Sequence, residues 1–307
     1  MESILRLLPE QVKEMMQSRV FQRIDEVQEI RLRIQRQVEL SSGGTPTFLP
    51  YIFTKEDAGL LIGKLANHSF YTLDEELRKG YVTIDGGHRI GLAGKVILEN
   101  GYVKAIRNLA SFNIRIAREK RGAAEPLIPY LYNGMWKHTM IIGPPQTGKT
   151  TILRDLARLI SSGYPSMGIP SFKTGIVDER SEIAGCVDGV PQLSLGTRVD
   201  VLDACPKAEG MMMMIRSMSP EVLVVDEIGR EEDSFAIKEA VHAGISLVTT
   251  THGRGFEDIR KRPILSSLIE EKVFERYIEL SSQYGPGTIS CIRDAEGRVM
   301  MRDVVNT

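Results

Sequence analysis

One short segment of the sequence has the residue types needed to hold a phosphate chain. Residues 143–150 read GPPQTGKT and fit the pattern G-x-x-x-x-G-K-[ST] at every fixed position. Glycine lets such a loop turn its backbone N–H groups inward around a polyanion, and the helix N-terminus that follows adds partial positive charge. Lys149 can reach the β- and γ-phosphates, and the hydroxyl of Thr150 can bind Mg²⁺. We therefore predict nucleotide binding by Gly143, Pro144, Pro145, Gln146, Thr147, Gly148, Lys149, Thr150 and Thr151.

A second segment supplies the acids that a nucleotide hydrolase needs. Residues 222–225 (VLVV) predict a strand that is buried on both faces, and Asp226 and Glu227 follow it directly. Asp226 would hold Mg²⁺, and Glu227 would orient or deprotonate the attacking water. The alternative is that either acid only caps the next helix.

Polar residues also follow two other apolar strands. Asp178 and Glu179 come after residues 175–177, and His252 comes after residues 245–248 and three threonines. Taken alone, such residues are more typical of a solvated turn. In a parallel sheet the carboxyl ends of the strands share one edge, where ligands bind, so we predict that these three residues are catalytic. A neutral imidazole at that edge could sense the γ-phosphate by hydrogen bonding.

The second half of the chain has the pattern that would bring these residues together. Short apolar runs at residues 139–142, 175–177, 222–225 and 245–248 alternate with helical stretches, which predicts βαβ units and a mostly parallel sheet. The methionines of residues 211–214 fall in a predicted helix and are interpreted as core residues. Beyond residue 256 a helix over 264–279 and a hairpin of residues 288–292 and 299–305 are expected, and no role is predicted for residues 256–307.

The first 118 residues have a different pattern. A helix is expected from Ile4 to Met16, and residues 28–34 alternate between apolar and charged types, as in a half-buried strand. Strands are predicted at 81–84, 88–98, 102–107 and 112–116, with Asn100 and Gly101 forming a hairpin turn. We predict an α+β domain over residues 1–118, a polar linker over 119–126 and a P-loop domain over 127–307.

The composition limits the function further. The chain has 307 residues and a formal net charge of -1, which disfavours a protein that mainly coats nucleic acid. The sequence has neither an apolar run of membrane-spanning length nor the features of a signal peptide. Its 3 cysteines are far apart and form no C-x-x-C pair, which disfavours a zinc site or a disulfide framework and favours a reducing cytoplasm.

In these residues the chain resembles the secretion superfamily of ATPases, which power type II and type IV secretion and pilus movement. That family has a Walker A loop, an acidic Asp box, a Walker B strand and a His box, in this order. They match Gly143–Thr150, Asp178–Glu179, Asp226–Glu227 and His252. Among its members the chain is most similar to ATPases of endospore-forming bacteria, in strings that include VDERSEIAG and MMMMIRSMSPEVLVVDEIGR. Unlike many secretion ATPases, which have glycine there, the chain has Asp226.

The resemblance implies a RecA-like domain, ATP and Mg²⁺ as cofactors, and a homo-hexameric ring. It further implies a protein of the mother-cell cytoplasm, peripheral to a membrane complex, whose partner is a channel protein between mother cell and forespore. In such rings the N-terminal domain closes over the nucleotide, and arginines stabilise phosphate charge. The candidates for this role are Arg115, Arg118, Arg180 and Arg230.

Two other functions remain open at this point. A nucleic-acid-dependent P-loop ATPase is the main alternative, because relatives in plastids and cyanobacteria attach a nucleic-acid module to a similar core. The aromatic content of 6% and the absence of a stacking platform rich in Phe or Tyr disfavour it, so no nucleic-acid partner is expected. A nucleotide-switched scaffold without hydrolysis would require Glu227 and Glu179 to lie far from the γ-phosphate.

Overall fold

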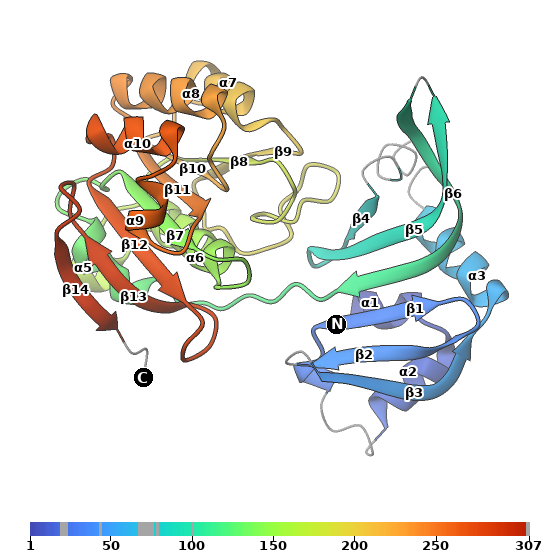
Figure 1. The fold of residues 1–307 in the computed structure, drawn as a ribbon. Helices are drawn as coiled ribbons and strands as arrows, with labels where there is room; N and C mark the ends of the chain where they lie inside the picture. Colours follow the sequence, from blue (N-terminus) through green and yellow to red (C-terminus); the bar gives the residue numbers. More distant parts are fainter. Residues whose placement is uncertain (19–23, 43–44, 67–76, 78–79, 100, 305–307) are drawn as a thin grey trace. The chain divides into compact units, whose positions relative to one another are not determined.

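The computed structural model describes residues 1–18, 24–42, 45–66, 77, 80–99 and 101–304, and its chain divides into two units (Figure 1). The first unit comprises Met1–Arg118 and the second Glu119–Thr307. Each unit has hydrophobic core clusters of its own.

The first unit is built on an antiparallel sheet in the order β3-β2-β1-β6-β5-β4. In β1 the residues Ile30 and Leu32 are buried and alternate with charged residues, as the sequence predicts. The strands are β1 (Glu29–Arg33), β2 (Arg36–Ser42), β3 (Thr45–Phe53), β4 (Tyr81–Ile84), β5 (His88–Glu99) and β6 (Tyr102–Arg115).

Helices α1 (Glu2–Leu7), α2 (Glu10–Gln17) and α3 (Lys55–Ala66) contribute to the core of this unit together with the sheet. The single helix predicted at the start of the chain is two helices, because Pro9 cannot continue the hydrogen-bond ladder and stands at the N-cap of α2. The sequence predicts that Thr54 and Asp57 form a capping box, and the structure confirms it at the start of α3: the Thr54 N–H donates to the Asp57 carboxylate, and the Asp57 N–H donates to the Thr54 hydroxyl. The predicted short helix beginning near Thr72 lies outside the described residues.

The hairpin of β5 and β6 is longer than predicted. The two strands expected at residues 102–107 and 112–116 form one strand, β6, whose pairing with β5 continues across a bulge. At this bulge Asn108 adopts a positive φ, and a Cβ on Gly94 would lie 2.6 Å from the Arg107 carbonyl oxygen. The irregular backbone therefore interrupts the alternation that sequence analysis uses to follow a strand.

The second unit is built on a sheet in the order β14-β13-β12-β7-β11-β10-β8-β9, in which the six strands from β12 to β9 are parallel. This arrangement confirms the predicted α/β class with a mostly parallel sheet. The strands are β7 (Thr139–Gly143), β8 (Thr174–Asp178), β9 (Val199–Asp203), β10 (Val222–Val225), β11 (Ser246–His252), β12 (Arg276–Ser281), β13 (Thr288–Arg293) and β14 (Val299–Val304).

Helices cover both faces of this sheet (Figure 1). One face packs against α6 (Lys149–Ser162) and the short α5 (Ile128–Leu131). The other packs against α7 (Lys207–Ser217), α8 (Glu231–His242), α9 (Phe256–Ile259) and α10 (Pro263–Glu270). In α7, Met211 and Met214 belong to this core as expected, whereas Met213 is 46% exposed.

Two parts of the second unit differ from expectation. The helix predicted over 264–279 ends at Glu270, and β12 begins at Arg276, because Ile278 and Leu280 are buried at strand spacing in the sheet core. Strand β9 is not among the predicted strands, and it carries Asp200 and Asp203 in its five residues. The predicted hairpin of β13 and β14 is present among the described residues.

The segment predicted as a linker is part of the second unit. Ala123 and Ala124 are buried in its core, and the Ala124 N–H donates to the carboxylate of Asp155 on α6 at 2.9 Å. The small alanines that suggested a flexible connection instead allow the backbone to approach α6 closely.

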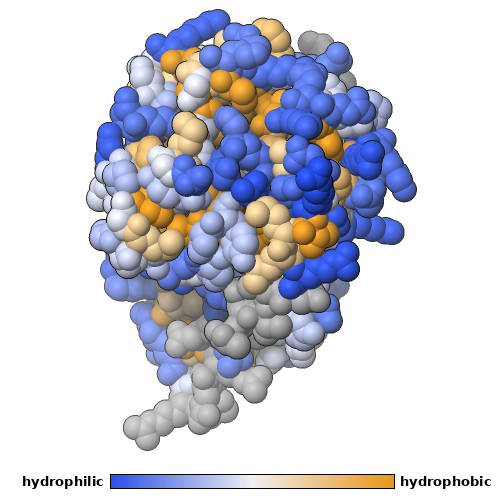
Figure 2. All heavy atoms as spheres, turned by 90° about the vertical axis from the view of Figure 1, so that its left-hand side faces the viewer, coloured by the Kyte–Doolittle hydropathy of each residue, from blue (hydrophilic) through white to orange (hydrophobic). Residues whose placement is uncertain are grey.

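The surface facing the viewer in Figure 2 has hydrophobic residues in separate patches among hydrophilic ones. Among the residues that the structure describes, no helix has the length and apolar character required to cross a membrane.

Candidate nucleotide site

The carboxyl ends of four parallel strands lie side by side and carry the predicted motifs. The register places Gly143 of β7 beside His252 of β11, and Val225 of β10 beside both Thr249 of β11 and Val177 of β8. The phosphate loop (Gly143–Thr150), the two acidic pairs and the histidine therefore meet at one edge of the sheet.

The phosphate loop joins the buried strand β7 to α6. Gly148 has a φ of 88° at the N-cap of α6, and Gln146 also has a positive φ. The Thr147 hydroxyl donates to the Pro144 carbonyl at 2.8 Å and closes the turn. Glycine meets the backbone requirement at 148 without strain, which is the reason that the motif specifies it.

Lys149 is buried and is held by the loop itself. Its Nζ donates to the carbonyl oxygens of Gly143 at 2.8 Å and Pro144 at 2.9 Å, and it lies 3.0 Å from Nδ1 of His252. Burial lowers the pKa of this lysine, and the charge of Glu227 opposes that effect. A phosphate chain in the loop would offer Lys149 a stronger, charged acceptor than these carbonyls.

His252 connects Lys149 to Glu227. The lysine ammonium can only donate, so Nδ1 of His252 accepts and Nε2 carries the proton that faces Oε1 of Glu227. The other carboxylate oxygen of Glu227 lies 2.6 Å from Nη1 of Arg180. Lys149, His252, Glu227 and Arg180 thus form a continuous row, which we call the polar chain.

The backbone of Glu227 is also held in a special position. It has a φ of 51°, and its N–H donates to the hydroxyl of Thr250 on β11 at 2.8 Å. The next residue, Ile228, donates its N–H to the Thr250 carbonyl at 2.9 Å. These contacts turn the chain sharply after β10 and direct Glu227 toward His252.

Asp178 differs from its predicted catalytic role. It is fully buried, and its two oxygens accept three backbone N–H groups, from Glu182, Ile183 and Ala184, at 2.8–2.9 Å. Burial raises its pKa, and these hydrogen bonds oppose the rise. Both oxygens already have partners, so Asp178 shapes the loop that follows β8.

Glu179 lies in a cationic environment. Its carboxylate contacts Nζ of Lys207 at 2.7 Å and Nη1 of Arg230 at 3.7 Å. Partial burial alone would raise its pKa, but the hydrogen bond and charge of Lys207, with Arg230, place the pKa below its usual value. Sequence analysis missed Lys207, because a lysine at the start of a helix gives no sign that it will be 5% exposed.

Asp226 is suited to a cation. It is 5% exposed, and burial together with the charge of Asp178 raises its pKa to about 7, whereas Lys207 acts in the opposite direction. Thr150 is the second residue of α6, which follows β7, and β11 lies between β7 and β10 in the sheet. No group of three or more potential ligands occurs in the described ranges, so a metal here would need phosphate or water oxygens, as Mg²⁺ usually does.

The four candidate arginines are divided between the units. Arg180 contacts Glu227, and Arg230 contacts Glu179 weakly, so both lie at the sheet edge. Arg115 is an exposed residue at the end of β6, and Arg118 donates to the Val27 carbonyl at 2.6 Å; both belong to the first unit. The structure thus brings two of the four to the predicted site.

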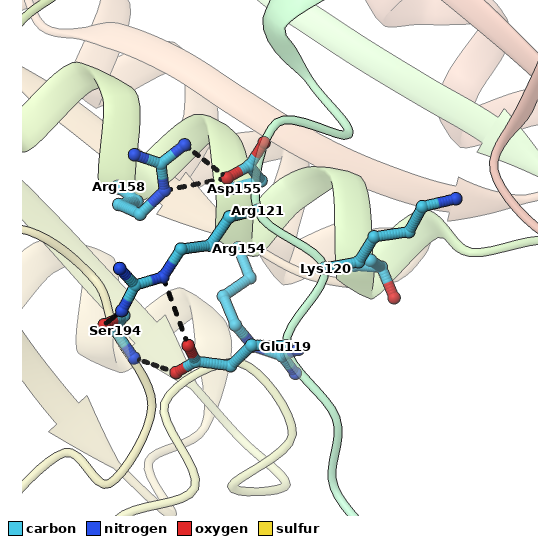
Figure 3. A pocket seen from close by; sticks show the side chains of 8 residues that line it. Glu119, Lys120, Arg121, Arg154, Asp155, Arg158 and Ser194 are labelled. Atoms are coloured by element: carbon cyan, nitrogen blue, oxygen red, sulfur yellow. Dashed lines mark hydrogen bonds and ion pairs between the residues drawn. The ribbon is translucent and has the colours of Figure 1, made fainter. Parts of the chain in front are cut away.

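A small pocket beside α6 shows how residues 119–121 pack (Figure 3). Arg121 donates to the Ser194 hydroxyl at 2.5 Å and lies 3.5 Å from Glu119, while Lys120 points away from both. On α6, Arg158 pairs with Asp155 at 2.7 Å. Thr151 also lines this pocket, so the predicted linker extends along the helix that carries the end of the phosphate loop.

Arg154 joins α6 to the loop after β8. Its guanidinium donates to the carbonyls of Ile183 at 2.6 Å and Glu182 at 2.5 Å. The same loop donates its N–H groups to Asp178. A movement of α6 would therefore reach the acidic segment at Glu179 through hydrogen bonds.

Comparisons with known proteins give the family and the fold of the chain. The chain is 60% identical to stage III sporulation protein AA of Bacillus subtilis (strain 168) over 302 residues, which cover 98% of each protein. The X-ray structure of the Legionella pneumophila ATPase DotB matches with a TM-score of 0.56 at 16% identity, covering 82% of this chain and 72% of that one. The pilus retraction motor PilT, solved with bound ADP, matches with a TM-score of 0.55 at 14% identity, covering 85% and 76%.

The two structural matches establish the RecA-like fold of secretion ATPases, which the resemblance implied. The profile of the family described as "Sporulation stage III, protein AA" matches residues 1–300. The chain therefore belongs to the sporulation stage III protein AA family.

Proposed function

We propose that this chain is an ATP-hydrolysing ring motor of the secretion-ATPase type that serves a sporulation channel. The observation that carries the proposal is the polar chain, which connects the phosphate-loop lysine to an acid after β10 through one imidazole. Such a row, at the carboxyl edge of a parallel sheet, links the place where phosphate binds to the place where water must be activated.

The residues have separate tasks in this proposal. The N–H groups of the phosphate loop and Lys149 hold the phosphates, and Thr150 and Asp226 would hold Mg²⁺, which neutralises charge on the phosphate oxygens when bound. Glu227 orients the attacking water and accepts its proton. Because both oxygens of Glu227 have partners, a bound nucleotide must first draw Lys149 from His252 and loosen the row.

Glu179 and the arginines would act on the charge that develops during hydrolysis. Arg180 already lies beside Glu227 and is the arginine closest to the proposed reaction in the second unit. Arg115 and Arg118 belong to the first unit, and in a ring they would act on nucleotide from their own or a neighbouring chain. A homo-hexamer is the assembly that the resemblance implies.

The proposed setting follows from the relatives. A relative named for stage III of sporulation and a fold shared with the ATPase DotB and the pilus motor PilT support a motor that acts in sporulation, and the family resemblance implies the mother-cell cytoplasm. Its partner would be a membrane channel protein, with the ring held peripherally at the membrane. ATP and Mg²⁺ are the proposed cofactors.

The test combines two variants with matched controls. Lys149→Ala should abolish tight ATP binding, whereas Lys173→Ala, an exposed lysine at the opposite edge of the sheet, should not. Glu227→Gln should keep ATP binding and lower turnover by about 10²- to 10⁴-fold, whereas Glu232→Gln on the surface of α8 should leave turnover unchanged. Full turnover by Glu227→Gln would move the catalytic role to another residue.

The ring is tested by dilution. Turnover per chain and molecular mass should fall together as the protein concentration is lowered. A monomer with undiminished turnover would exclude a ring motor, and stimulation by single-stranded DNA that is lost at high salt would favour the nucleic-acid-dependent alternative. Capture with the Glu227→Gln protein and ATP from sporulating cells should recover a membrane protein as the partner.

A further inference from the structure

Internal hydrogen bonds fix the conformation of the loop between β12 and β13. It comprises residues 282–287 (SQYGPG), and Gly285 and Gly287 both have positive φ values. The Gly285 N–H donates to the Ser282 carbonyl at 3.1 Å, and the Thr288 hydroxyl donates to the Gly285 carbonyl at 2.7 Å. We call this segment the hairpin loop.

The hairpin loop packs directly on the phosphate loop. The Gly287 N–H donates to the Thr147 carbonyl at 2.8 Å. The approach is so close that a Cβ on Gly148 would lie 2.8 Å from the nitrogen and 3.1 Å from the Cα of Gly287. The two loops are in direct backbone contact. The hairpin loop is therefore fixed to the phosphate loop, although it lies more than 130 residues further along the chain.

The strand order indicates which end of a nucleotide would face the hairpin loop. The polar chain begins at Lys149 and continues toward β11 and β10, so the terminal phosphate and the attacking water belong on that side of β7. Strand β12 pairs with β7 on its other side. A nucleotide whose last phosphate lies at His252 therefore has its nucleoside directed toward the side of β12 and the hairpin loop.

An aromatic residue is present at that place. Tyr284 is 66% exposed, and its hydroxyl accepts a hydrogen bond from Nε2 of Gln283 at 3.3 Å. Any nucleobase can stack on such a ring, because stacking uses the π-face of the base and not the hydrogen-bonding groups at its edge. An exposed ring on a loop that is anchored to the phosphate cradle is suited to this contact.

We infer that Tyr284 is the stacking platform for the nucleobase of the bound nucleoside triphosphate. This inference rests on the proposed nucleotide site and assigns a task to the end of the chain, for which the sequence predicts none. The hairpin loop then contributes at two points: the Gly287 N–H fixes the turn of the phosphate loop at Thr147, and Tyr284 holds the base.

The test compares two ligands that share phosphates but not a base. Binding of ATP and of inorganic tripolyphosphate is measured by calorimetry with the full chain and Mg²⁺. Tyr284→Ala should weaken ATP binding by about 5- to 100-fold and leave tripolyphosphate binding unchanged, because only stacking is lost. Tyr284→Phe should retain ATP affinity within about twofold. The matched control Tyr102→Ala, which removes a tyrosine of the first unit that is 80% exposed, should change neither affinity.

A spectroscopic measurement gives an independent readout. In Tyr284→Trp, ATP should quench the fluorescence of the new indole, and tripolyphosphate should not, while the native Trp136 is buried and gives a constant background. Equal ATP affinity in the wild type and Tyr284→Ala, or an equal loss for both ligands, would overturn the inference while leaving nucleotide binding intact. A wild-type protein that binds neither ligand would overturn the proposed function and the inference with it.

Discussion

Asn in place of Asp226 should stabilise the metal-free protein, and the gain should depend on pH. The pKa of Asp226 is raised from 3.8 to about 7, because the carboxyl is buried and lies near Asp178. In the folded protein the ionised carboxylate is therefore disfavoured relative to the unfolded chain. A pKa that is higher in the folded state gives stability that is complete below about pH 4 and is lost as the pH rises through 7.

The size of the effect follows from the shift. A difference of about three pKa units corresponds to about 4 kcal/mol of unfolding free energy once the pH exceeds 7. Asp226→Asn cannot ionise, so at pH 8 it should be more stable than the wild type by up to about 4 kcal/mol, and at pH 5 by about half of that.

Urea unfolding in the presence of a chelator measures this difference. Trp136 is the sole tryptophan and is 2% exposed in the core of the second unit, so its fluorescence reports on the unit that contains Asp226. The exposed loop residue Asp188 provides the control variant Asp188→Asn, which should show no comparable gain. A gain that is the same at pH 5 and pH 8 would refute the argument. With Mg²⁺ and ATP present, the wild type should be more stable than Asp226→Asn, because the cation stabilises the carboxylate and not the amide.

Three further variants test other contacts of the site. Gly148→Ala should abolish nucleotide binding and lower the unfolding free energy by about 1–3 kcal/mol, because the φ of residue 148 is 88° and the new Cβ would clash with Gly287. Calorimetry measures the loss of binding, and urea unfolding measures the loss of stability. Lys207→Met should lower turnover while ATP still binds, because Glu179 loses its nearest cation, and unchanged turnover would remove Glu179 from the reaction. Asp178→Asn should cost about 1–3 kcal/mol by leaving a buried N–H without an acceptor, and a neutral result in urea unfolding would contradict its structural role.

The parts of the fold that sequence analysis predicted have local causes. The phosphate loop needs a particular residue at each fixed position, and strands such as β10 are buried on both faces, so their sequences are continuous apolar runs. Once the strands were recognised as parallel, the common edge of Asp226, Glu227 and His252 followed from geometry. The order of the strands themselves did not, because it depends on packing between distant segments.

The features that sequence analysis missed depend on long-range contacts. The contact of Gly287 with Thr147 joins two glycine-containing turns, and each of them alone has only the pattern of an ordinary loop. Lys207 is a lysine at the start of a helix, a place where lysines are usually solvated, and its partner Glu179 follows a distant strand, β8. The alanines at 123 and 124 suggest a linker until α6 is placed beside them.

In each acidic pair, Asp178–Glu179 and Asp226–Glu227, the two neighbouring acids lie in different environments. Asp178 and Asp226 end adjacent parallel strands and are both buried, whereas Glu179 and Glu227, one residue further, contact cations at the edge. Glu227 leaves the extended conformation with a φ of 51°, and Glu179 follows the last residue of β8, so each pair has one buried acid and one acid at the edge. Burial raises the pKa of Asp226, and the charge of Asp178 raises it further. A divalent cation at Asp226 would offset the cost of ionising this buried carboxyl, so the same geometry would favour the binding of metal and nucleotide together.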